Sequence, residues 1–237
     1  MMEKIKMIRF YLIISSGSFL LFTLGCEKGY ENITITDIEG NIYQTDKIGN
    51  QFWMTENLRT ARFNDSTSIP KVEDCVWWES LKSPGFCWYN NSPEINRNVY
   101  GALYNWYAVN SGRLCPSGWH IPTDNDWKIL EKYLGMDQTE TDASDWRGEG
   151  LAYKMKSTMD WNNDSNGNNS SGFSGLPGGT RWPGCEFDNI KNMGCWWSAT
   201  EKGEGEVWYR SLSSNVSTIG RVSAFKIWGL SVRCIKN

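Results

Sequence analysis

The order of apolar and polar positions along the chain predicts strands first, then helices, then strands again. Strand patterns begin at Thr34, and the alternating segment 42–48 is followed by Gly49-Asn50 and a second apolar segment, 51–54. Because Gly and Asn tolerate positive φ, this arrangement predicts a β-hairpin. Residues 64–98 contain three prolines and many turn formers, so we expect them to be mostly irregular.

Two main helices are predicted in the middle of the chain. The first covers residues 99–109, where three side chains share one face: Leu103, Trp106 and Tyr107. The second begins after Thr123 as N-cap, with Asp126 at the capping-box position, and ends at Gly135. A shorter helical turn is expected over residues 151–156.

After a long polar loop at residues 159–172 the pattern becomes β again. The strands expected there are 178–182, 186–190, 195–198, 207–212 and 225–234. In the last of these Leu230, Val232 and Cys234 alternate with polar residues, so one face is expected to be buried. This order predicts an α+β fold, predominantly antiparallel β with two main helices.

The first 25 residues predict a lipoprotein signal peptide. Three basic residues precede an apolar run, 10–24, which is short and interrupted compared with the roughly 20 apolar residues of a transmembrane helix. The run ends in Thr23-Leu24-Gly25-Cys26, which resembles a bacterial lipobox with Thr23 where Leu is usual. The resemblance implies that Cys26 carries the lipid. The solvated residues Glu27, Lys28 and Glu31 indicate that 26–35 is a short tether, which leaves 36–237 as the expected folded domain. The alternatives are an ordinary secretory signal and an uncleaved anchor.

The cysteine count agrees with a lipid anchor. The chain has seven cysteines, and an odd number in an exported protein needs an explanation. Lipidation of Cys26 leaves an even set suited to disulfides: Cys75, Cys87, Cys115, Cys185, Cys195 and Cys234. Six cysteines allow 15 connectivities, and the sequence does not choose between them.

Charge and aromatic content restrict the partners. The formal charge is −3, and residues 1–25 contribute three positive charges and one negative, so the mature chain is near −5 (−3 minus +2). We therefore expect no nucleic acid partner, and contact with the membrane through the N-terminal lipid. Most of the 14 tryptophans are expected to fill the core, whereas two or three line a ligand-binding cleft near the 159–172 loop, with Trp161 and Trp182 as the candidates.

Seven segments follow one another along the chain: IGNQFWMTENLRT, FCWYNN, YGALYNWYAV, LCPSGWHIPTDNDW, SGFSGLPGG, WWSAT and GLSVRCIKN. In this order they resemble the Fibrobacter succinogenes major paralogous domain (FISUMP) family. The resemblance extends from about Thr36 to Asn237 and implies an exported protein of Bacteroidetes-like bacteria. The family has no established activity, so the resemblance implies architecture and location and no mechanism.

A more distant resemblance concerns the fold. The segment 119–127, WHIPTDNDW, is similar to the W-R-L-P-T-E-x-E-W segment of formylglycine-generating-enzyme-like domains, and 229–233 resembles their closing G-F-R motif. The resemblance implies a C-type-lectin-like fold, in which both chain ends lie in one sheet and Cys115 pairs with Cys234. The pairs Cys75–Cys87 and Cys185–Cys195 are close in sequence and are the further candidates. No motif around Cys185 and Cys195 matches the reactive cysteines of those enzymes.

The sequence offers little catalytic machinery. His120 is the single histidine, and we expect it to have a structural role with a hydrogen bond to the backbone. There is no G-x-S-x-G, P-loop, G-x-G-x-x-G or C-x-x-C pattern. We therefore expect a protein that is not an enzyme, although a paired-carboxylate glycosidase stays open because acidic residues are numerous.

Calcium is the one metal that the sequence suggests. Asn162, Asp164 and Asn166 partly fit the D-x-[DN]-x-[DN]-G loop, whose oxygen-bearing side chains wrap a hard cation. Phe173 stands where a bidentate Glu would close such a loop, and the simpler interpretation is a solvated Asn-rich loop. We expect no cofactor, with low-affinity calcium as the alternative.

These features predict an outer-membrane lipoprotein, periplasmic or surface-exposed, with a non-catalytic binding or adhesion role. Its ligand is expected to be a glycan or an envelope protein. The alternatives are a structural subunit of an outer-membrane assembly without a small ligand, and a glycan-acting enzyme.

Overall fold

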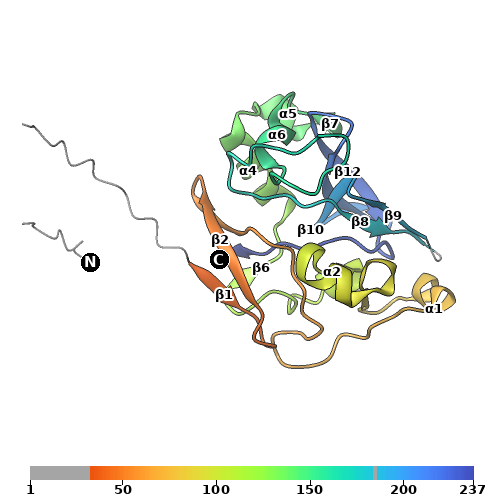
Figure 1. The fold of residues 1–237 in the computed structure, drawn as a ribbon. Coiled ribbons are helices and arrows are strands. Elements are labelled where there is room, and N and C mark those ends of the chain that lie inside the picture. The colour runs from red at the N-terminus through yellow and green to blue at the C-terminus, as the bar shows by residue number, and fades with distance from the viewer. Residues whose placement is uncertain (1–32, 184–185) are drawn as a thin grey trace, which may run out of the picture. The chain divides into compact units, whose positions relative to one another are not determined.

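The computed structural model describes residues 33–183 and 186–237 (Figure 1). The expected signal peptide, the anchor Cys26 and Cys185 lie outside these residues. The first strand starts at Thr34, two residues before the expected domain boundary.

Thirteen strands and six α-helices form in the described part of the chain. The strands are β1 (Thr34–Thr36), β2 (Ile42–Ile48), β3 (Gln51–Met54), β4 (Phe86–Cys87), β5 (Leu103–Tyr104), β6 (Trp119–His120), β7 (Asp145–Arg147), β8 (Gly178–Arg181), β9 (Phe187–Ile190), β10 (Met193–Gly203), β11 (Glu206–Ser213), β12 (Ile219–Phe225) and β13 (Ile235–Lys236). The helices are α1 (Cys75–Ser80), α2 (Pro93–Tyr100), α3 (Trp106–Val109), α4 (Asp124–Leu134), α5 (Gln138–Asp142) and α6 (Leu151–Met155), with a 3-10 helix η1 (Tyr89–Asn91).

The strands form two larger sheets and two small ones. One sheet has the order β1-β2-β3-β13-β6 and the other β10-β11-β12-β7, while β4-β5 and β8-β9 pair separately. All these strand pairs are antiparallel. The predicted hairpin at Gly49-Asn50 is confirmed, since Ile48 lies opposite Gln51. The fold is therefore mostly antiparallel β, and α4, α5 and α6 lie together beside β7 and β12 (Figure 1).

Helix α4 is the predicted second helix, and its ends are those that the sequence specifies. The Asp126 amide donates to Thr123 Oγ1 at 3.2 Å, and the Thr123 amide donates to Asp126 Oδ2 at 2.9 Å. This capping box satisfies two amides that have no partner within the helix. At the other end Gly135 takes the left-handed conformation, with φ 117°.

The prediction of one continuous helix over residues 99–109 is wrong. Helix α2 ends at Tyr100, β5 follows, and α3 is a separate short helix that Asn105 caps from its side chain. The break lies at Gly101, whose φ is 74° and where a Cβ would lie 2.7 Å from the Leu58 carbonyl oxygen. Tertiary contact with another segment therefore interrupts a pattern that looks locally helical.

The segment 64–98 is more ordered than its turn-rich composition predicts. Asp74 caps α1 by accepting the Trp77 amide at 2.8 Å. Pro93 begins α2, where its missing N–H costs no hydrogen bond, so here proline starts a helix.

The predicted strand 225–234 is also wrong. Phe225 ends β12, and the later residues pair only through isolated bridges before β13. The expectation that only one face of this segment is buried is wrong as well, because the polar residues Ser231 and Arg233 are as deeply buried as their apolar neighbours. The buried guanidinium of Arg233 is satisfied by hydrogen bonds. It donates to Asn57 Oδ1 and to the carbonyl oxygens of Met54, Phe173 and Ser174.

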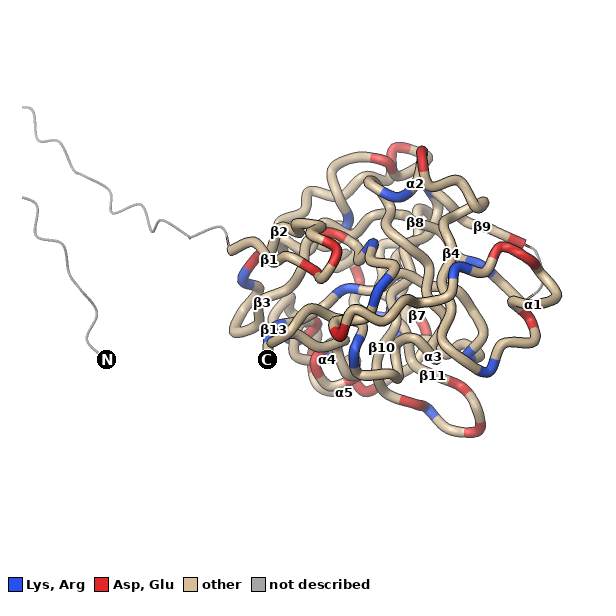
Figure 2. Tube along the Cα trace, turned by 90° about the horizontal axis from the view of Figure 1, so that it is seen from below, with Lys and Arg blue, Asp and Glu red and all other residues tan. Residues whose placement is uncertain are grey.

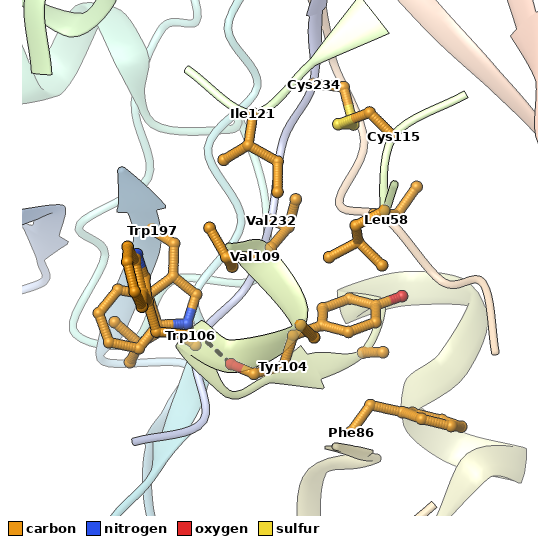
Figure 3. Packing of buried hydrophobic residues seen from close by; sticks show 14 of the residues in the cluster. Leu58, Phe86, Tyr104, Trp106, Val109, Cys115, Ile121, Trp197, Val232 and Cys234 are labelled. Carbon is orange, nitrogen blue, oxygen red and sulfur yellow. Dashed lines mark hydrogen bonds between the residues drawn. A yellow bond between two sulfur atoms is a disulfide. The ribbon is translucent and has the colours of Figure 1, made fainter. Parts of the chain in front are cut away.

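Tryptophan builds the core, as expected. Eight of the 14 rings are buried: Trp53, Trp78, Trp88, Trp106, Trp127, Trp161, Trp196 and Trp197. Trp197 Nε1 donates to the Tyr104 carbonyl oxygen at 2.7 Å, so that the ring stays buried with its polar atom satisfied (Figure 3).

A buried ion network joins α4 to the four-stranded sheet. Glu131 accepts from Arg147 at 2.7 Å and from Arg210 at 2.6 Å, and Asp124 accepts from Arg210 and Arg221, both at 2.8 Å. Elsewhere, basic and acidic residues are both spread over the described part of the chain (Figure 2). The network gives each of these buried charges an opposite partner, which is the condition for tolerating them inside a protein.

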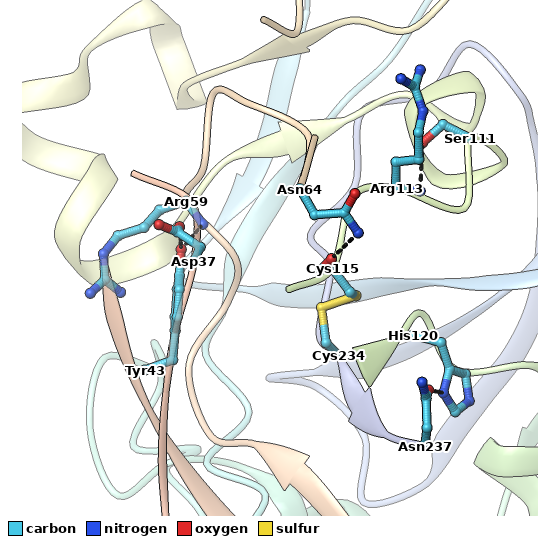
Figure 4. Close-up of a disulfide and its surroundings, with 10 residues drawn as sticks. All are labelled: Asp37, Tyr43, Arg59, Asn64, Ser111, Arg113, Cys115, His120, Cys234 and Asn237. Carbon is cyan, nitrogen blue, oxygen red and sulfur yellow. Dashed lines mark hydrogen bonds between the residues drawn. A yellow bond between two sulfur atoms is a disulfide. The ribbon is translucent and has the colours of Figure 1, made fainter. Parts of the chain in front are cut away.

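The Cys115–Cys234 disulfide is present, with its Cα atoms 5.9 Å apart (Figure 4). The other two expected pairings, Cys75–Cys87 and Cys185–Cys195, are wrong, because Cys87 and Cys195 are free thiols and Cys75 is itself disulfide-bonded. Both free thiols are buried and pack as small apolar side chains. Burial raises the pKa of Cys87 to about 11 and that of Cys195 to about 12.

Candidate ligand-binding site

Trp161 does not line a cleft, contrary to the expectation. Its ring is only 5% exposed, and its Nε1 donates to the Gly175 carbonyl oxygen at 3.0 Å and to Ser157 Oγ at 3.2 Å. Lys156 Nζ lies 4.9 Å from the ring centroid. Trp161 therefore supports the loop from beneath and has no face left for a ligand.

Trp182 lies in a different group of aromatic side chains. It is half-buried, and its ring centroid is 4.2 Å from that of Trp228, which in turn lies 6.4 Å from Tyr209. Trp161 instead belongs to the core around Trp53. The structure thus does not bring the two predicted ring candidates together in one cleft.

The polar loop 159–172 is nevertheless held firmly against α6. The amides of Gly167, Asn168 and Ser171 donate to carbonyl oxygens of Ser157, Tyr153 and Lys154 at 2.8, 3.0 and 3.1 Å. A Cβ at position 167 would lie 2.5 Å from the Tyr153 carbonyl oxygen and closer still to that of Lys156, so only glycine allows this approach. The loop therefore has a defined backbone despite its composition.

A polar hollow of about 410 Å³ opens between this loop, α6 and the connection from β11 to β12. We call it the loop hollow. Its lining includes Tyr153, Lys156, Asp164, Asn166, Asn215 and Ser217. Of these, the sequence singled out only Asp164 and Asn166; a second serine- and asparagine-rich stretch at 213–218 was the available signal for the opposite wall.

The two walls of the loop hollow are linked by a direct hydrogen bond. Ser165 Oγ donates to the Ser214 carbonyl oxygen at 2.6 Å. Asn166 Oδ1 accepts the Trp161 amide at 3.0 Å, which fixes the side chain of Asn166 in the wall. The hollow is thus preformed.

Several polar groups of the loop hollow have no hydrogen-bond partner in the described part of the chain. These are the Asp164 carboxylate, the Asn166 amide nitrogen and the Asn215 amide nitrogen. Tyr153 contributes an aromatic ring that is 52% exposed. Acceptors, donors and an apolar ring surface therefore meet around one space.

Lys156 adds a buried cation to the floor. The residue is 4% exposed, and its Nζ has one long hydrogen bond, 3.4 Å to the Val216 carbonyl oxygen. Burial lowers the pKa of Lys156. An ammonium group with unused donors in such surroundings is well placed to meet an incoming oxygen atom.

The predicted calcium ligands only partly converge. Asp164 and Asn166 both line the loop hollow, but Asn166 Oδ1 already accepts the Trp161 amide, and the Asn162 amide nitrogen donates to Asn192 Oδ1 at 3.1 Å. In residues 33–183 and 186–237, no three His, Cys, Asp or Glu side chains gather as a metal-binding group. Calcium binding stays a prediction.

His120 has a structural position, but its partners are side chains and not the expected backbone. Nδ1 lies 2.6 Å from Asn237 Oδ1 and Nε2 lies 3.4 Å from Asp126 Oδ2 (Figure 4). The ring thus links the last residue of the chain to the capping box of α4.

These features define the class of protein: an aromatic-rich, mostly antiparallel β domain locked by a disulfide near its C-terminus. The chain belongs to the Fibrobacter succinogenes major domain family, whose model matches residues 47–236. Neither the search of curated proteins nor that of solved structures gave a match. In the described residues, each helix is too short or too polar to cross a membrane.

Proposed function

We propose that this protein is a lipid-anchored cell-envelope protein that binds neutral glycans, without cleaving them, in the loop hollow. The observation that carries the proposal is the set of unpartnered polar groups beside the exposed ring of Tyr153. The sequence supports the location through its signal-peptide pattern and Cys26.

The chemistry of the loop hollow suits a sugar ring. Sugar hydroxyls both donate and accept hydrogen bonds, so they need acceptors and donors side by side. Asp164 supplies an acceptor, while Asn215 and Lys156 supply donors. The apolar face of a pyranose can pack on the Tyr153 ring, because an aromatic side chain combines apolar surface with a polar tip.

A binding role fits the loop hollow better than hydrolysis. Glycoside hydrolases use two carboxyl groups that flank the scissile bond about 5–10 Å apart. Asp164 is the single acidic residue among those that line the loop hollow. This arrangement supports a protein that holds a glycan and is not an enzyme.

We further propose that the fold is C-type-lectin-like. Two features support this: β1 and β13 lie in the same five-stranded sheet, and a disulfide joins Cys115, in the segment that leads into β6, to Cys234, directly before β13. A crystal structure compared with C-type-lectin-like domains tests this proposal. A different strand order in the sheet that holds the two ends would contradict it.

The location is tested on the native protein. Mass spectrometry of protein from detergent-solubilised membranes should find an acylated Cys26 as the first residue, and a polypeptide that keeps residues 1–25 would overturn the lipoprotein proposal. Protease treatment of intact cells then separates a surface-exposed from a periplasmic outer-membrane protein.

Binding is tested with a panel of neutral tetrasaccharides from glucan, xylan and mannan, titrated calorimetrically. We expect at least one to bind, and the Tyr153→Ala and Asn215→Ala variants to bind it about tenfold more weakly, since one lost contact of about 1.4 kcal/mol changes affinity tenfold. The matched control is Tyr133→Ala, which removes a 62% exposed tyrosine of α4 that is not among the residues lining the loop hollow. Absence of binding to every panel member, or wild-type affinity in Tyr153→Ala, would reject the proposal.

A further inference from the structure

A second hollow, of about 330 Å³, lies between loop 61–71, β4 and α2, and it has a different character. We call it the cationic hollow. Its lining includes Glu39, Arg62, Lys71, Phe86, Trp88 and Arg97. No residue is shared with the loop hollow, so the two sites can be tested separately.

The floor of the cationic hollow is rigid. Phe86 and Trp88 are buried, and their rings meet edge to face with centroids 5.4 Å apart. The wall above them is fixed by backbone hydrogen bonds, from the Ile69 amide to the Ala61 carbonyl oxygen at 2.8 Å and from the Phe86 amide to the Pro70 carbonyl oxygen at 3.0 Å. A ligand would therefore enter a preformed space.

The lining carries three cations and one carboxylate, a net charge of +2. Two of the cations already have an acidic neighbour: Arg62 Nε lies 4.0 Å from Glu39 and Lys71 Nζ lies 2.7 Å from Glu73. Their side chains are about half exposed, at 49% and 48%, so these pairs are weak.

Arg97 is the cation without a carboxylate. Its guanidinium carbon lies 5.5 Å from the Trp88 ring centroid, and within the described residues no acidic oxygen comes within 4.0 Å and no acceptor takes its N–H groups. This cation–π contact holds the guanidinium over the Trp88 ring while its donors stay free. A guanidinium in this state is suited to receive a carboxylate through two parallel hydrogen bonds.

Glu39 restricts which anion fits. Its Oε2 accepts the Ala61 amide at 2.6 Å and Thr60 Oγ1 at 3.0 Å, which fixes the carboxylate at the rim. A doubly charged phosphate would meet this negative charge, whereas a singly charged acid with hydroxyl groups can donate a hydrogen bond to Glu39.

We infer that the cationic hollow binds a hydroxylated monocarboxylate, of the kind found in the hexuronic acid units of acidic saccharides. Arg97 receives the carboxylate, Arg62 and Lys71 add long-range attraction, and Glu39 accepts a ring hydroxyl. The inference does not depend on neutral glycan binding in the loop hollow.

Calorimetric titration of the protein with D-glucuronate, D-glucose, D-gluconate and inorganic phosphate tests this inference. We expect glucuronate to bind, glucose to bind at least tenfold more weakly, and binding of glucuronate to weaken as salt rises. If gluconate binds as tightly as glucuronate, the ligand is still a hydroxylated monocarboxylate, but an open-chain one is accepted too. If gluconate binds more weakly, the ligand is the ring form found in saccharides. Phosphate binding more tightly than glucuronate, or equal affinity for glucose, would overturn the inference.

The variant that removes the proposed contact between Arg97 and the ligand carboxylate is Arg97→Gln, and Arg113→Gln is the matched control. Arg113 also lies over an aromatic ring, 4.5 Å from the Phe63 centroid, but it is paired with Asp65 and lies outside the cationic hollow. Arg97→Gln should lose at least tenfold in glucuronate affinity with an unchanged circular dichroism spectrum, and Arg113→Gln should lose nothing. Wild-type affinity in a folded Arg97→Gln protein would refute the inference. Tyr153→Ala should leave glucuronate binding intact.

Discussion

Cys115 and Cys234 are joined by a disulfide across a sequence separation of 119 residues. Cys115 precedes β6 and Cys234 precedes β13, and these two strands are neighbours in the five-stranded sheet. The bond therefore holds together two segments, from the middle and the end of the sequence, that form neighbouring strands of the sheet, and it keeps them close even in the unfolded chain.

Removal of this bond should reduce the stability substantially. Closing a loop of this length removes chain entropy worth roughly 5 kcal/mol in the unfolded state, so we expect Cys115→Ala/Cys234→Ala to lose several kcal/mol of unfolding free energy. Urea unfolding followed by tryptophan fluorescence measures the loss. Cys87→Ala, which removes a buried free thiol, is the control and should cost about 1 kcal/mol. A double variant as stable as this control would contradict the expectation.

The buried network around Asp124 predicts a loss of stability in acid. Burial raises the pKa of Asp124, but the hydrogen bonds from Arg221 and the charge of Arg210 outweigh it and lower the pKa to about 2. A depressed carboxyl pKa contributes stability above the ordinary value near 4, and this contribution, about 2 kcal/mol, is lost as the pH falls towards 2.

Urea midpoints measured between pH 6 and pH 2 test this prediction. The Asp124→Asn variant should be less stable at neutral pH and should show a flatter decline in acid than the wild type. Asp188→Asn, which removes an exposed carboxylate on β9, should keep the wild-type slope. Parallel acid profiles for the wild type and Asp124→Asn would show that Asp124 is not the titrating group.

Arg233 should not tolerate lysine. Its guanidinium donates to Asn57 Oδ1 at 2.9 Å and to three carbonyl oxygens, and burial lowers its pKa only to about 9, so the cation persists at neutral pH. A lysine ammonium cannot reproduce the planar fork and leaves buried acceptors unpaired. We expect Arg233→Lys to cost about 3 kcal/mol in the urea unfolding free energy. The exposed Arg113→Lys should cost less than about 0.5 kcal/mol, and equal costs for the two variants would disprove the argument.

Gly167 should control the shape of the loop hollow. Because a side chain there would collide with the α6 backbone, Gly167→Ala should displace the loop and weaken the proposed glycan binding more than it changes global stability. Hydrogen exchange of the Asn168 and Ser171 amides, which bond to α6, should become at least tenfold faster. Gly112→Ala is the control for a glycine replaced outside the loop: a Cβ there meets nothing within 4 Å, and although its φ of 67° disfavours alanine, the exchange of the Asn168 and Ser171 amides should stay unchanged. Unchanged exchange in Gly167→Ala would rule out this steric role.

The sequence predicted those elements whose signals are local. The capping box of Thr123 and Asp126 and the turn at Gly49 form within a few residues, so their pattern is complete in the sequence. The break at Gly101 and the burial of Arg233 depend on Leu58 and Asn57, more than 40 residues away, and no local pattern contains them.

The candidate site likewise has some features with a local sequence signal and others that depend on distant residues. The polar loop was recognisable, and with it Asp164 and Asn166, but the opposite wall at Asn215 lies about 50 residues later in the chain. The roles of Trp161 and Trp182 were not recognisable, because a tryptophan buried beneath a loop and one packed half-buried against another ring have the same local sequence signal. Burial is a property of the assembled neighbours.

The β-rich class, the capped helix, the long polar loop and the set of cysteines could all be inferred from the sequence alone. The pairing of the cysteines, the exposure of the aromatic rings and the grouping of polar side chains around one space became known only from the folded chain. The physical reason is that turns and caps are satisfied by neighbours in sequence, whereas disulfides, burial and binding sites require groups that only folding brings together.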